Sequence, residues 1–270
     1  MAKRRICTIS LASHRIAVST PAVTALHYSQ QNQLLAALSP SELKRLNLQL
    51  TSLPLGKVLH EPEQAQPYIY FPVECIVSLL HVLNDGDSAE ISVVGNDGLV
   101  GIAAFMGGQS TPSRAVVQSG GLAYQMAGYH LREIFRTDEA MQALLLRYTQ
   151  ALMTQMAQTA VCNRHHTVDQ QLCRWLLLSL DRLVSNQLIM TQELIANMLG
   201  VRREGVDEAA GKLDRLGIIR YCSGKITVLD RPNLEQMCCE CYSVVKRETD
   251  RLRPLPYRSP VESPTPIAVA

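Results

Sequence analysis

Residues 190–230 contain two stretches in which hydrophobic positions recur every three or four residues, followed by a stretch in which they alternate. This change of period predicts two short helices and then a β-hairpin. The turn of the hairpin falls at Ser223-Gly224, within the run IIRYCSGKITVL. The predicted inner faces are Leu194, Ile195, Met198 and Leu199 on the first helix, and Val206, Ala209, Ala210, Leu213 and Leu216 on the second.

Polar and small residues mark the ends of these two helices. Thr191 is placed to cap the first, because its hydroxyl can accept a hydrogen bond from a backbone N–H one turn later. Gly200 ends that helix where a left-handed backbone is needed, and the second helix begins near Arg202. Ala196 is small enough for the two helices to cross closely. The pair, its glycine turn and the hairpin together predict a winged helix-turn-helix.

A unit of this kind places its second helix in the major groove of DNA. Side chains on the outer face of that helix can reach base edges, where arginine bonds guanine and glutamate accepts from cytosine. The predicted base contacts are Arg203, Glu204, Asp207 and Glu208. The predicted contacts to the DNA backbone are Arg202, Lys212, Arg215, Arg220 and Lys225. The alternative for each of these side chains is a solvated position on an exposed helix face.

From about residue 53 to residue 126 the pattern changes to short apolar runs separated by turn signals rich in Gly, Asn and Asp. The runs are PLGKVL, YIYFPVE, CIVSLLHVL, SAEISVV, LVGIAAF, RAVVQSG and LAYQM. Strands of this length and spacing predict a β-roll or jelly roll. Before them, residues 32–50 predict one or two helices, with a capping box formed by Ser39 and Glu42.

Residues 131–163 predict one long helix with very little charge. Such a helix must be covered on most sides, so we expect it to pack against the β-roll and against the same helix of a second protomer. The alternative is a core helix in a monomer. The predicted dimer seam, which follows the spacing of a coiled coil, is Met141, Leu145, Tyr148, Leu152 and Met156.

These patterns predict an α+β protein with an N-terminal β-roll (jelly-roll-like) sensory domain, a long dimerisation helix and a C-terminal winged helix-turn-helix. The DNA-binding domain begins with an amphipathic helix that holds Trp175 and ends with a helix that starts at Asp230. The predicted segments are a disordered basic arm (1–30), the β-roll (31–130), the dimerisation helix (131–163), the DNA-binding domain (164–253) and a disordered proline-rich tail (254–270).

The block GVRREGVDEAAGKLDRLGIIRY resembles the recognition helix and wing of the Crp/Fnr family of transcription regulators. The block GNDGLVGIAAFMGGQSTPSRAVV resembles the central hairpin and short helix of that family's cyclic-nucleotide-binding domain. The resemblance covers roughly residues 32–250 and implies a homodimer on a palindromic operator, with RNA polymerase as a further partner. It also implies that Arg203 and Glu204 read the half-site. The chain departs from the family pattern at Gly205 and Glu208.

The same resemblance bears on the ligand of the β-roll. Cyclic-nucleotide binders of the family carry a glutamate for the ribose hydroxyl and an Arg-Ser or Arg-Thr pair for the phosphate. This chain has Ile102 at the first position and the reversed order Ser113-Arg114 at the second. We therefore expect an unknown small-molecule effector, or none, in a pocket that includes Ile102, Ser113 and Arg114. A cyclic-nucleotide-responsive regulator is the alternative, with Arg114 otherwise facing solvent or pairing with a carboxylate such as Glu90.

The eight cysteines do not form the even framework of a small secreted protein, so we expect reduced thiols in a cytoplasmic protein. Cys238, Cys239 and Cys241 form one cluster, and Cys162 lies near His165 and His166. Neither cluster has paired CxxC spacing. Family members with an iron-sulfur cluster use cysteines near the N-terminus, where this chain has only Cys7. The sequence therefore predicts no metal and no cofactor.

Composition agrees with a globular DNA-binding protein. Hydrophobic residues make up 47% of the chain and charged residues 19%, which is enough apolar content for two cores. Residues 164–253 are mildly basic, with 14 Lys and Arg against 12 Asp and Glu. No apolar run is long enough to cross a membrane, so no membrane contact is expected.

A metal-dependent enzyme with a β-barrel is the alternative from another class of function. Such an enzyme needs two or three histidines and a carboxylate that converge inside the barrel. The β region contains only His60 and His81, which are far apart and do not form an H-x-H pair. The chain also lacks a nucleophile motif, so the sequence predicts that the protein is not an enzyme.

Overall fold

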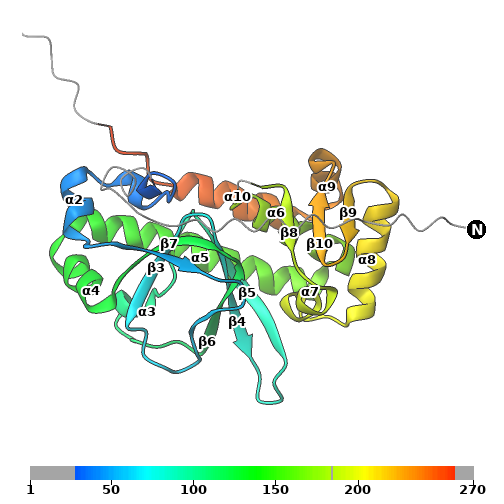
Figure 1. The fold of residues 1–270 in the computed structure, drawn as a ribbon, viewed down its shortest axis with the longest axis horizontal. Helices are drawn as coiled ribbons and strands as arrows, with labels where there is room; N and C mark the ends of the chain where they lie inside the picture. Colours follow the sequence, from blue (N-terminus) through cyan, green and yellow to red (C-terminus); the bar gives the residue numbers. More distant parts are fainter. Residues whose placement is uncertain (1–27, 184, 259–270) are drawn as a thin grey trace, which may run out of the picture.

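The computed structural model describes residues 28–183 and 185–258. A β-roll lies at one end of the molecule and a small helical domain with a three-stranded sheet at the other, and a long helix connects them (Figure 1). The predicted α+β architecture is confirmed. The disordered arm predicted for residues 1–30 lies almost wholly outside the described residues, as does most of the tail predicted for 254–270.

The β-roll is built from two antiparallel sheets, with the strand orders β1-β7-β3 and β2-β6-β4-β5. Its core is lined by the inward side chains of both sheets, such as Ile69, Val77 and Val117. The strands are β1 (Gln49–Leu53), β2 (Val58–His60), β3 (Tyr68–Pro72), β4 (Ile76–Val82), β5 (Ser88–Val94), β6 (Ser113–Ser119) and β7 (Gly121–Ala127).

Two predictions in this region are wrong in detail. Residues 32–50 were predicted as helical, but they hold only the short helices η1 (Leu35–Ala37) and α2 (Pro40–Arg45). The last two residues of that stretch already belong to strand β1. The run LVGIAAF is not a strand: it becomes the helix α3 (Ala103–Met106) after one isolated bridge at Val100. The capping box at the start of α2 is confirmed, since the Ser39 hydroxyl accepts from the Glu42 N–H and the Glu42 carboxylate accepts from the Ser39 N–H.

The helix predicted for residues 131–163 is broken at Asp138. The structure has α4 (Gly128–Thr137) and then α5 (Glu139–His165). Asp138 is extended and its carboxylate accepts from the Met141 N–H, so it caps α5 while Arg45 pairs with it at 3.1 Å. The prediction of one continuous helix is therefore wrong near its start. Helix α4 ends at Thr137, and Asp138 is the N-cap of a new helix.

The seam predicted on α5 faces the chain's own β-roll. Met141, Leu145 and Leu152 are at most 5% exposed and belong to the β-roll core. Tyr148 is buried with them and its hydroxyl donates to the Leu99 carbonyl at 2.7 Å. Met156 is half-buried against the same core. Four of these five residues are buried in the β-roll core and cannot also form a seam between protomers, so that assignment is corrected: they are the core face of α5, with Met156 at its edge.

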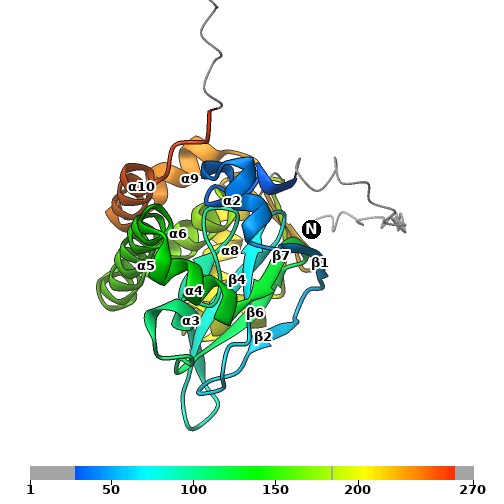
Figure 2. The same cartoon turned by 90° about the vertical axis from the view of Figure 1, so that its left-hand side faces the viewer.

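The DNA-binding domain follows α5. Its helices are α6 (Val168–Leu180), α7 (Gln192–Leu199), α8 (Arg203–Arg215) and α9 (Arg231–Met237), and its sheet has the order β8-β10-β9. The strands are β8 (Gln187–Ile189), β9 (Ile219–Cys222) and β10 (Lys225–Val228). Strand β8 was not predicted. A last helix, α10 (Glu240–Leu252), runs back along α5 toward the β-roll (Figures 1 and 2).

The chain remains ordered past the point at which the tail was predicted to begin. Beyond α10, the backbone N–H of Tyr257 donates to the Ala36 carbonyl at 2.8 Å. The first residues of the predicted tail are thus fixed against the N-terminal helices. In the part of the chain described, no helix combines the length and the apolar character needed to cross a membrane.

The two domains meet where α6 packs against β4 and β5. Ile76, Leu80 and Val93 of the β-roll belong to the same apolar cluster as Trp175 and Leu176 of α6. A buried chain of hydrogen bonds runs across the contact, from the Ser78 hydroxyl to the Gln118 amide and from that amide to the Ser179 hydroxyl, with distances of 2.9 and 3.2 Å. We call this contact the domain junction.

Charged side chains also cross the domain junction. Arg182, just after α6, pairs with Asp97 after β5, with Nη2 and Oδ2 2.7 Å apart and Nε and Oδ1 3.1 Å apart. Glu90 of β5 is buried and faces Arg174, Arg182 and Ser78. Burial raises the pKa of Glu90 to about 7, and the two arginines only partly oppose this shift.

Candidate DNA-binding interface

The turn between α7 and α8 has the geometry that the sequence predicts. The Thr191 hydroxyl accepts from the Leu194 N–H at 3.3 Å and caps α7. Gly200 is left-handed, with φ 65°, and the next N–H, that of Val201, returns to the Ala196 carbonyl at 3.1 Å. Helix α8 then starts at Arg203, with Arg202 as its extended N-cap. These local contacts fix the angle at which α8 leaves α7.

The inner face of α8 is mostly as predicted. Val206, Ala209 and Leu213 are at most 1% exposed and pack against α6 and α7. Two predicted inner residues are wrong: Leu194 is 41% exposed and Leu216 is 59% exposed. Leu216 is the C-cap of α8 and lies beyond its last packed turn, whereas Leu194 lies on the first turn of α7.

The outer face of α8 carries the four predicted base contacts, and all four are exposed. The Arg203 side chain is 58% exposed and lies 3.9 Å from Glu193 and 4.0 Å from Asp207. Ion pairs of this length and exposure are weak. The Arg203 guanidinium can therefore leave these carboxylates for a guanine edge at little cost, and Glu204 and Glu208 stand beside it on the same face.

Most of the predicted backbone contacts are also exposed. Arg202, Arg215, Arg220 and Lys225 surround α8 and have no ion pair among the described residues. Lys212 differs, because its ammonium pairs with Asp169 of α6. This hydrogen bond raises the pKa of Lys212, and a phosphate would have to replace the carboxylate.

The wing beside α8 is a tight hairpin. Ser223 and Gly224 both have positive φ, 51° and 74°, as a two-residue hairpin turn requires. The third strand, β8, pairs with β10 and holds the wing against the start of α7. The Tyr221 hydroxyl donates to the Met190 carbonyl at 3.1 Å and fastens the same edge. The run QLI at 187–189 alternates in polarity, but three residues were too few for a sequence signal.

The β-roll holds a small, partly open hollow of about 40 Å³ in the place expected for an effector. Ile102 and Ser113 line it, as predicted, and Leu152 and Met156 of α5 close it from one side. His60 also lines it, and burial lowers the pKa of His60 to about 4, so its imidazole is neutral at pH 7. The walls are thus uncharged.

Arg114 is not part of that hollow. Its Nε donates to the Glu61 carboxylate at 2.6 Å on the half-exposed rim of the sheet. Two expectations are therefore corrected: Arg114 does not line the pocket, and its carboxylate partner is Glu61 rather than Glu90. Glu61 directly follows β2, which pairs with the β6 strand that carries Arg114, and no local sequence pattern predicts that register.

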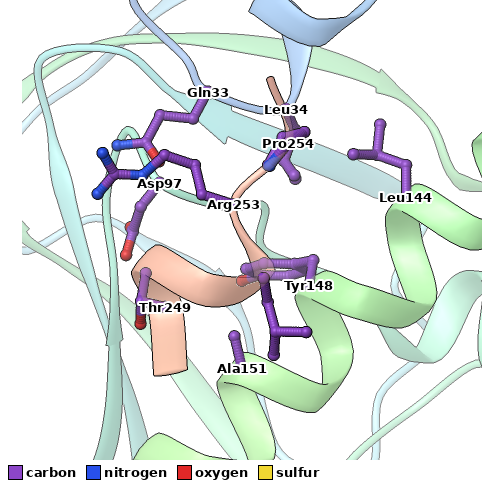
Figure 3. Close-up of a pocket in the computed structure, with 10 residues that line it drawn as sticks. Gln33, Leu34, Asp97, Leu144, Tyr148, Ala151, Thr249, Arg253 and Pro254 are labelled. Atoms are coloured by element: carbon purple, nitrogen blue, oxygen red, sulfur yellow. The ribbon is translucent and has the colours of Figure 1, made fainter. Parts of the chain in front are cut away.

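A second hollow lies between α5, α10 and the N-terminal helices (Figure 3). Tyr148 and Ala151 of α5 form one wall and Thr249 of α10 another, and Arg253 extends toward Gln33 and Asp97. The hollow is small and its lining belongs to four packed segments. We regard it as the packing boundary between α10 and the rest of the molecule.

The structure also brings together the two cysteine clusters that the sequence leaves apart. Cys162 is near the end of α5, and Cys239 and Cys241 begin α10. Together with His166 they place four potential metal ligands within 4.8 Å of one another. The premise that the clusters are separate is wrong, because α10 packs on α5. The prediction of no metal stays untested.

Comparisons with known proteins agree with this geometry. Residues 170–237 match the model of the Crp-like helix-turn-helix domain. Among solved structures, FixK2 from Bradyrhizobium japonicum has a TM-score of 0.59 at 18% identity and covers 72% of this chain and 98% of its own. TTHB099, a CRP-family transcriptional regulator from Thermus thermophilus, has a TM-score of 0.59 at 17% identity and covers 69% and 95%.

A further solved structure, TTHA1359, is a CRP/FNR-family transcriptional regulator from Thermus thermophilus. It has a TM-score of 0.54 at 21% identity and covers 70% of this chain and 97% of its own. A comparison with curated protein sequences found no match. The likeness of these structures extends over both domains, so the β-roll is of the cyclic-nucleotide-binding-like type. The chain thus has the fold of the Crp/Fnr family of transcription regulators and carries that family's helix-turn-helix domain at residues 170–237.

Proposed function

We propose that this protein is a sequence-specific transcription regulator that binds a palindromic operator as a homodimer in the cytoplasm. The observation that carries the proposal is the outer face of α8, where Arg203 is exposed and held only by long ion pairs. Arginine in this position can bond the O6 and N7 atoms of guanine. The exposed cations around α8 can contact the flanking phosphates, which fix the helix in the groove.

The acidic residues of α8 favour a reader of sequence over a general DNA binder. Glu204, Asp207 and Glu208 repel phosphate, so α8 fits only where cytosine amines or other donors meet them. A genome-wide map of bound DNA in cells that express the tagged protein tests this. Sharp sites that share one palindromic motif are expected, whereas a uniform distribution of bound DNA would contradict the proposal.

The homodimer is proposed to form along the face of α5 that the β-roll and α10 leave open. Leu146, Met153 and Val161 are 50%, 63% and 45% exposed on this 27-residue helix. Large apolar side chains spaced along one exposed face suit a parallel contact with the same helix of a second copy. A two-fold axis along α5 would present two copies of α8 to one palindrome.

The dimer is tested by placing charge on the open face. Leu146→Asp with Met153→Asp should give a monomer that binds the operator weakly, because two carboxylates per protomer would be buried in the interface. Leu83→Asp is the matched control, since Leu83 is 55% exposed on the β4–β5 hairpin and outside α5. Analytical ultracentrifugation measures the outcome. A double variant that remains dimeric would refute this interface.

The effector, where there is one, is proposed to be an uncharged small molecule in the hollow behind Ile102. A cyclic nucleotide needs a cation for its phosphate and an acceptor for its ribose hydroxyl, and a buried group that lacks its partner costs about 1–3 kcal/mol. Arg114 is turned away to Glu61, and Ile102 offers no acceptor. Calorimetric titration with cyclic AMP should show no heat of binding and no change in operator affinity. Micromolar binding would favour the cyclic-nucleotide-responsive alternative.

A further inference from the structure

Four potential metal ligands meet where α5 ends and α10 begins. They are the thiols of Cys162, Cys239 and Cys241 and the imidazole of His166, and their donor atoms all lie within 4.8 Å of one another. The three cysteines are at most 5% exposed, and the His166 side chain is 13% exposed. The ligands come from two distant segments of the chain, 162–166 and 239–241, and the packing of α10 on α5 brings these segments together.

Two of the distances between these donor atoms match those of ligands around a single tetrahedral ion. With Zn–S bonds of about 2.3 Å and Zn–N bonds of about 2.05 Å, two sulfur ligands lie about 3.8 Å apart and a sulfur and a nitrogen about 3.6 Å apart. Here Cys162 Sγ and Cys239 Sγ are 3.6 Å apart, and Cys241 Sγ and His166 Nδ1 are 3.5 Å apart. The remaining distances between donor atoms are at most 4.8 Å, so shifts of about 1 Å would bring all four donors around one ion.

The surroundings of His166 fit the same interpretation. Its Nδ1 points toward the thiols, while its Nε2 lies 3.3 Å from the carboxylate of Glu240. A histidine that binds a metal through one nitrogen usually donates from the other nitrogen to a carboxylate, which fixes the tautomer and the ring orientation. Glu240, the first residue of α10, is positioned for that task.

A buried cation, Arg174, lies near the proposed ligands. Arg174 is 4% exposed, lies close enough to interact with Cys162 and Cys238, and has an Nε with no hydrogen-bond partner. Three thiolates and one neutral imidazole around a divalent ion carry a net charge of −1, and the buried guanidinium can offset it.

We propose that Cys162, His166, Cys239 and Cys241 bind one Zn²⁺ ion in a closed structural site. Three thiolates and an imidazole are a ligand set that Zn²⁺ prefers, and four protein ligands leave no position for a substrate. On binding, each cysteine releases its thiol proton to solvent and His166 coordinates through its unprotonated Nδ1. A [4Fe–4S] cluster fits less well, because its thiolates bind different irons and stand farther apart.

The position of the site gives it a structural role. His166 is the C-cap of α5, and Thr167 directly after it caps α6, the first helix of the DNA-binding domain. The ion would therefore fasten the end of α5, the start of α6 and the start of α10 at one point. Loss of the ion would free the hinge from which the DNA-binding domain leaves α5.

The test measures metal in the full-length protein, purified under reducing conditions without a polyhistidine tag. Wild type should contain about one zinc ion per chain by mass spectrometry of the elements. Cys239→Ser and His166→Gln should each lose most of it. The matched controls are Cys238→Ser and His165→Gln, which alter the neighbouring residue of the same type outside the set of four. Both controls should keep their zinc.

A second measurement decides the matter if the ligand variants do not fold. Wild type is stripped with a chelator and titrated with Co²⁺, whose visible absorption reports a tetrahedral site and whose near-ultraviolet charge-transfer bands report thiolate ligands. One equivalent of Co²⁺ with both signals supports the site. Wild type that takes up neither metal, or that carries a Cys162–Cys239 disulfide instead, overturns the proposal. Loss of zinc in Cys238→Ser with retention in His166→Gln overturns the ligand set.

Discussion

Glu90→Gln is expected to stabilise the folded protein above neutral pH and to change little at pH 5. The glutamine amide has the shape of the neutral carboxylic acid but does not titrate. Glu90 is fully enclosed at the domain junction, and one of its oxygens has no hydrogen-bond partner. Burial raises the pKa of Glu90 from 4.5 to about 7, because the enclosed site disfavours the carboxylate.

The sign and the magnitude follow from linkage. The folded state holds the Glu90 proton more tightly than the unfolded state does, so the free energy of unfolding falls as pH rises from 4.5 through about 7. The full loss, for a shift of about 2.5 pKa units, is about 3 kcal/mol above pH 7. Glu90→Gln removes this loss, so its advantage over wild type should approach about 3 kcal/mol at pH 8, fall below about 1 kcal/mol at pH 5 and vanish below about pH 4.

The assay is urea unfolding at pH 5 and pH 8, followed by the fluorescence of Trp175, the only tryptophan of the chain. Trp175 is 2% exposed and lies at the domain junction, so it reports on the contact that Glu90 affects. His60 titrates in the opposite sense, because its pKa is lowered to about 4 by burial and its contribution is lost as pH falls. That contribution is common to both proteins and cancels in their difference.

The control is Glu208→Gln, which neutralises an exposed carboxylate on the outer face of α8. It should leave the free energy of unfolding nearly unchanged at both pH values. A Glu90→Gln variant that is less stable than wild type at pH 8 would refute the reasoning. In that case the Glu90 carboxylate would be charged and its attraction to Arg174 and Arg182 would exceed the cost of burial.

Other expected outcomes follow from the same structure. Arg182→Ala removes the bidentate contact with Asp97 and should lower the free energy of unfolding by about 3 kcal/mol. The control Arg136→Ala removes an exposed ion pair and should lower it by less than about 0.5 kcal/mol. Urea unfolding measures both changes. Arg203→Ala should cost about 1–3 kcal/mol per half-site and relax preference at one base pair. Lys225→Ala should weaken binding to all sequences alike and flatten the dependence on salt, as measured by electrophoretic mobility shift. An Arg203→Ala variant with unchanged selectivity would exclude the assigned contact.

Local signals predicted the DNA-binding unit because its geometry depends on neighbouring residues. The Thr191 cap, the left-handed Gly200 and the Ser223-Gly224 turn each act within a few positions of the chain. The sequence was misleading only about the inner faces of the two helices, where one predicted inner residue on each helix is exposed. Leu194 and Leu216 keep the helical spacing, but the periodicity does not show where the partner helix stops.

The face of α5 could not be assigned from the sequence because this helix is apolar on two sides. Leu145 and Leu146 are adjacent in the chain, yet one is 1% exposed and the other 50%. A helix that both completes a domain core and offers an open apolar face shows two overlapping stripes, and periodicity alone does not say which stripe meets which partner. In the structure the β-roll covers the stripe that contains Leu145, and the stripe that contains Leu146 stays exposed.

Contacts between residues far apart in the chain were beyond sequence reasoning altogether. The Arg182–Asp97 pair spans 85 positions and the Cys162–Cys239 contact spans 77. Both depend on the course of α10 and α6 relative to the β-roll, which no local pattern encodes. Such pairs form only when the whole chain has folded and distant segments pack together. The partner of a buried charge can therefore be identified only from the fold.

Helix α5 connects the two regions to which the proposals refer. Leu152 and Met156 line the hollow of the β-roll, and Gln155, on the turn between them, contacts both Arg182 and the Val93 carbonyl at 3.2 Å. Ten residues after Leu152 comes Cys162, about 15 Å farther along the helix axis. A ligand that shifts this part of α5 must therefore disturb the domain junction before it reaches the DNA-binding domain.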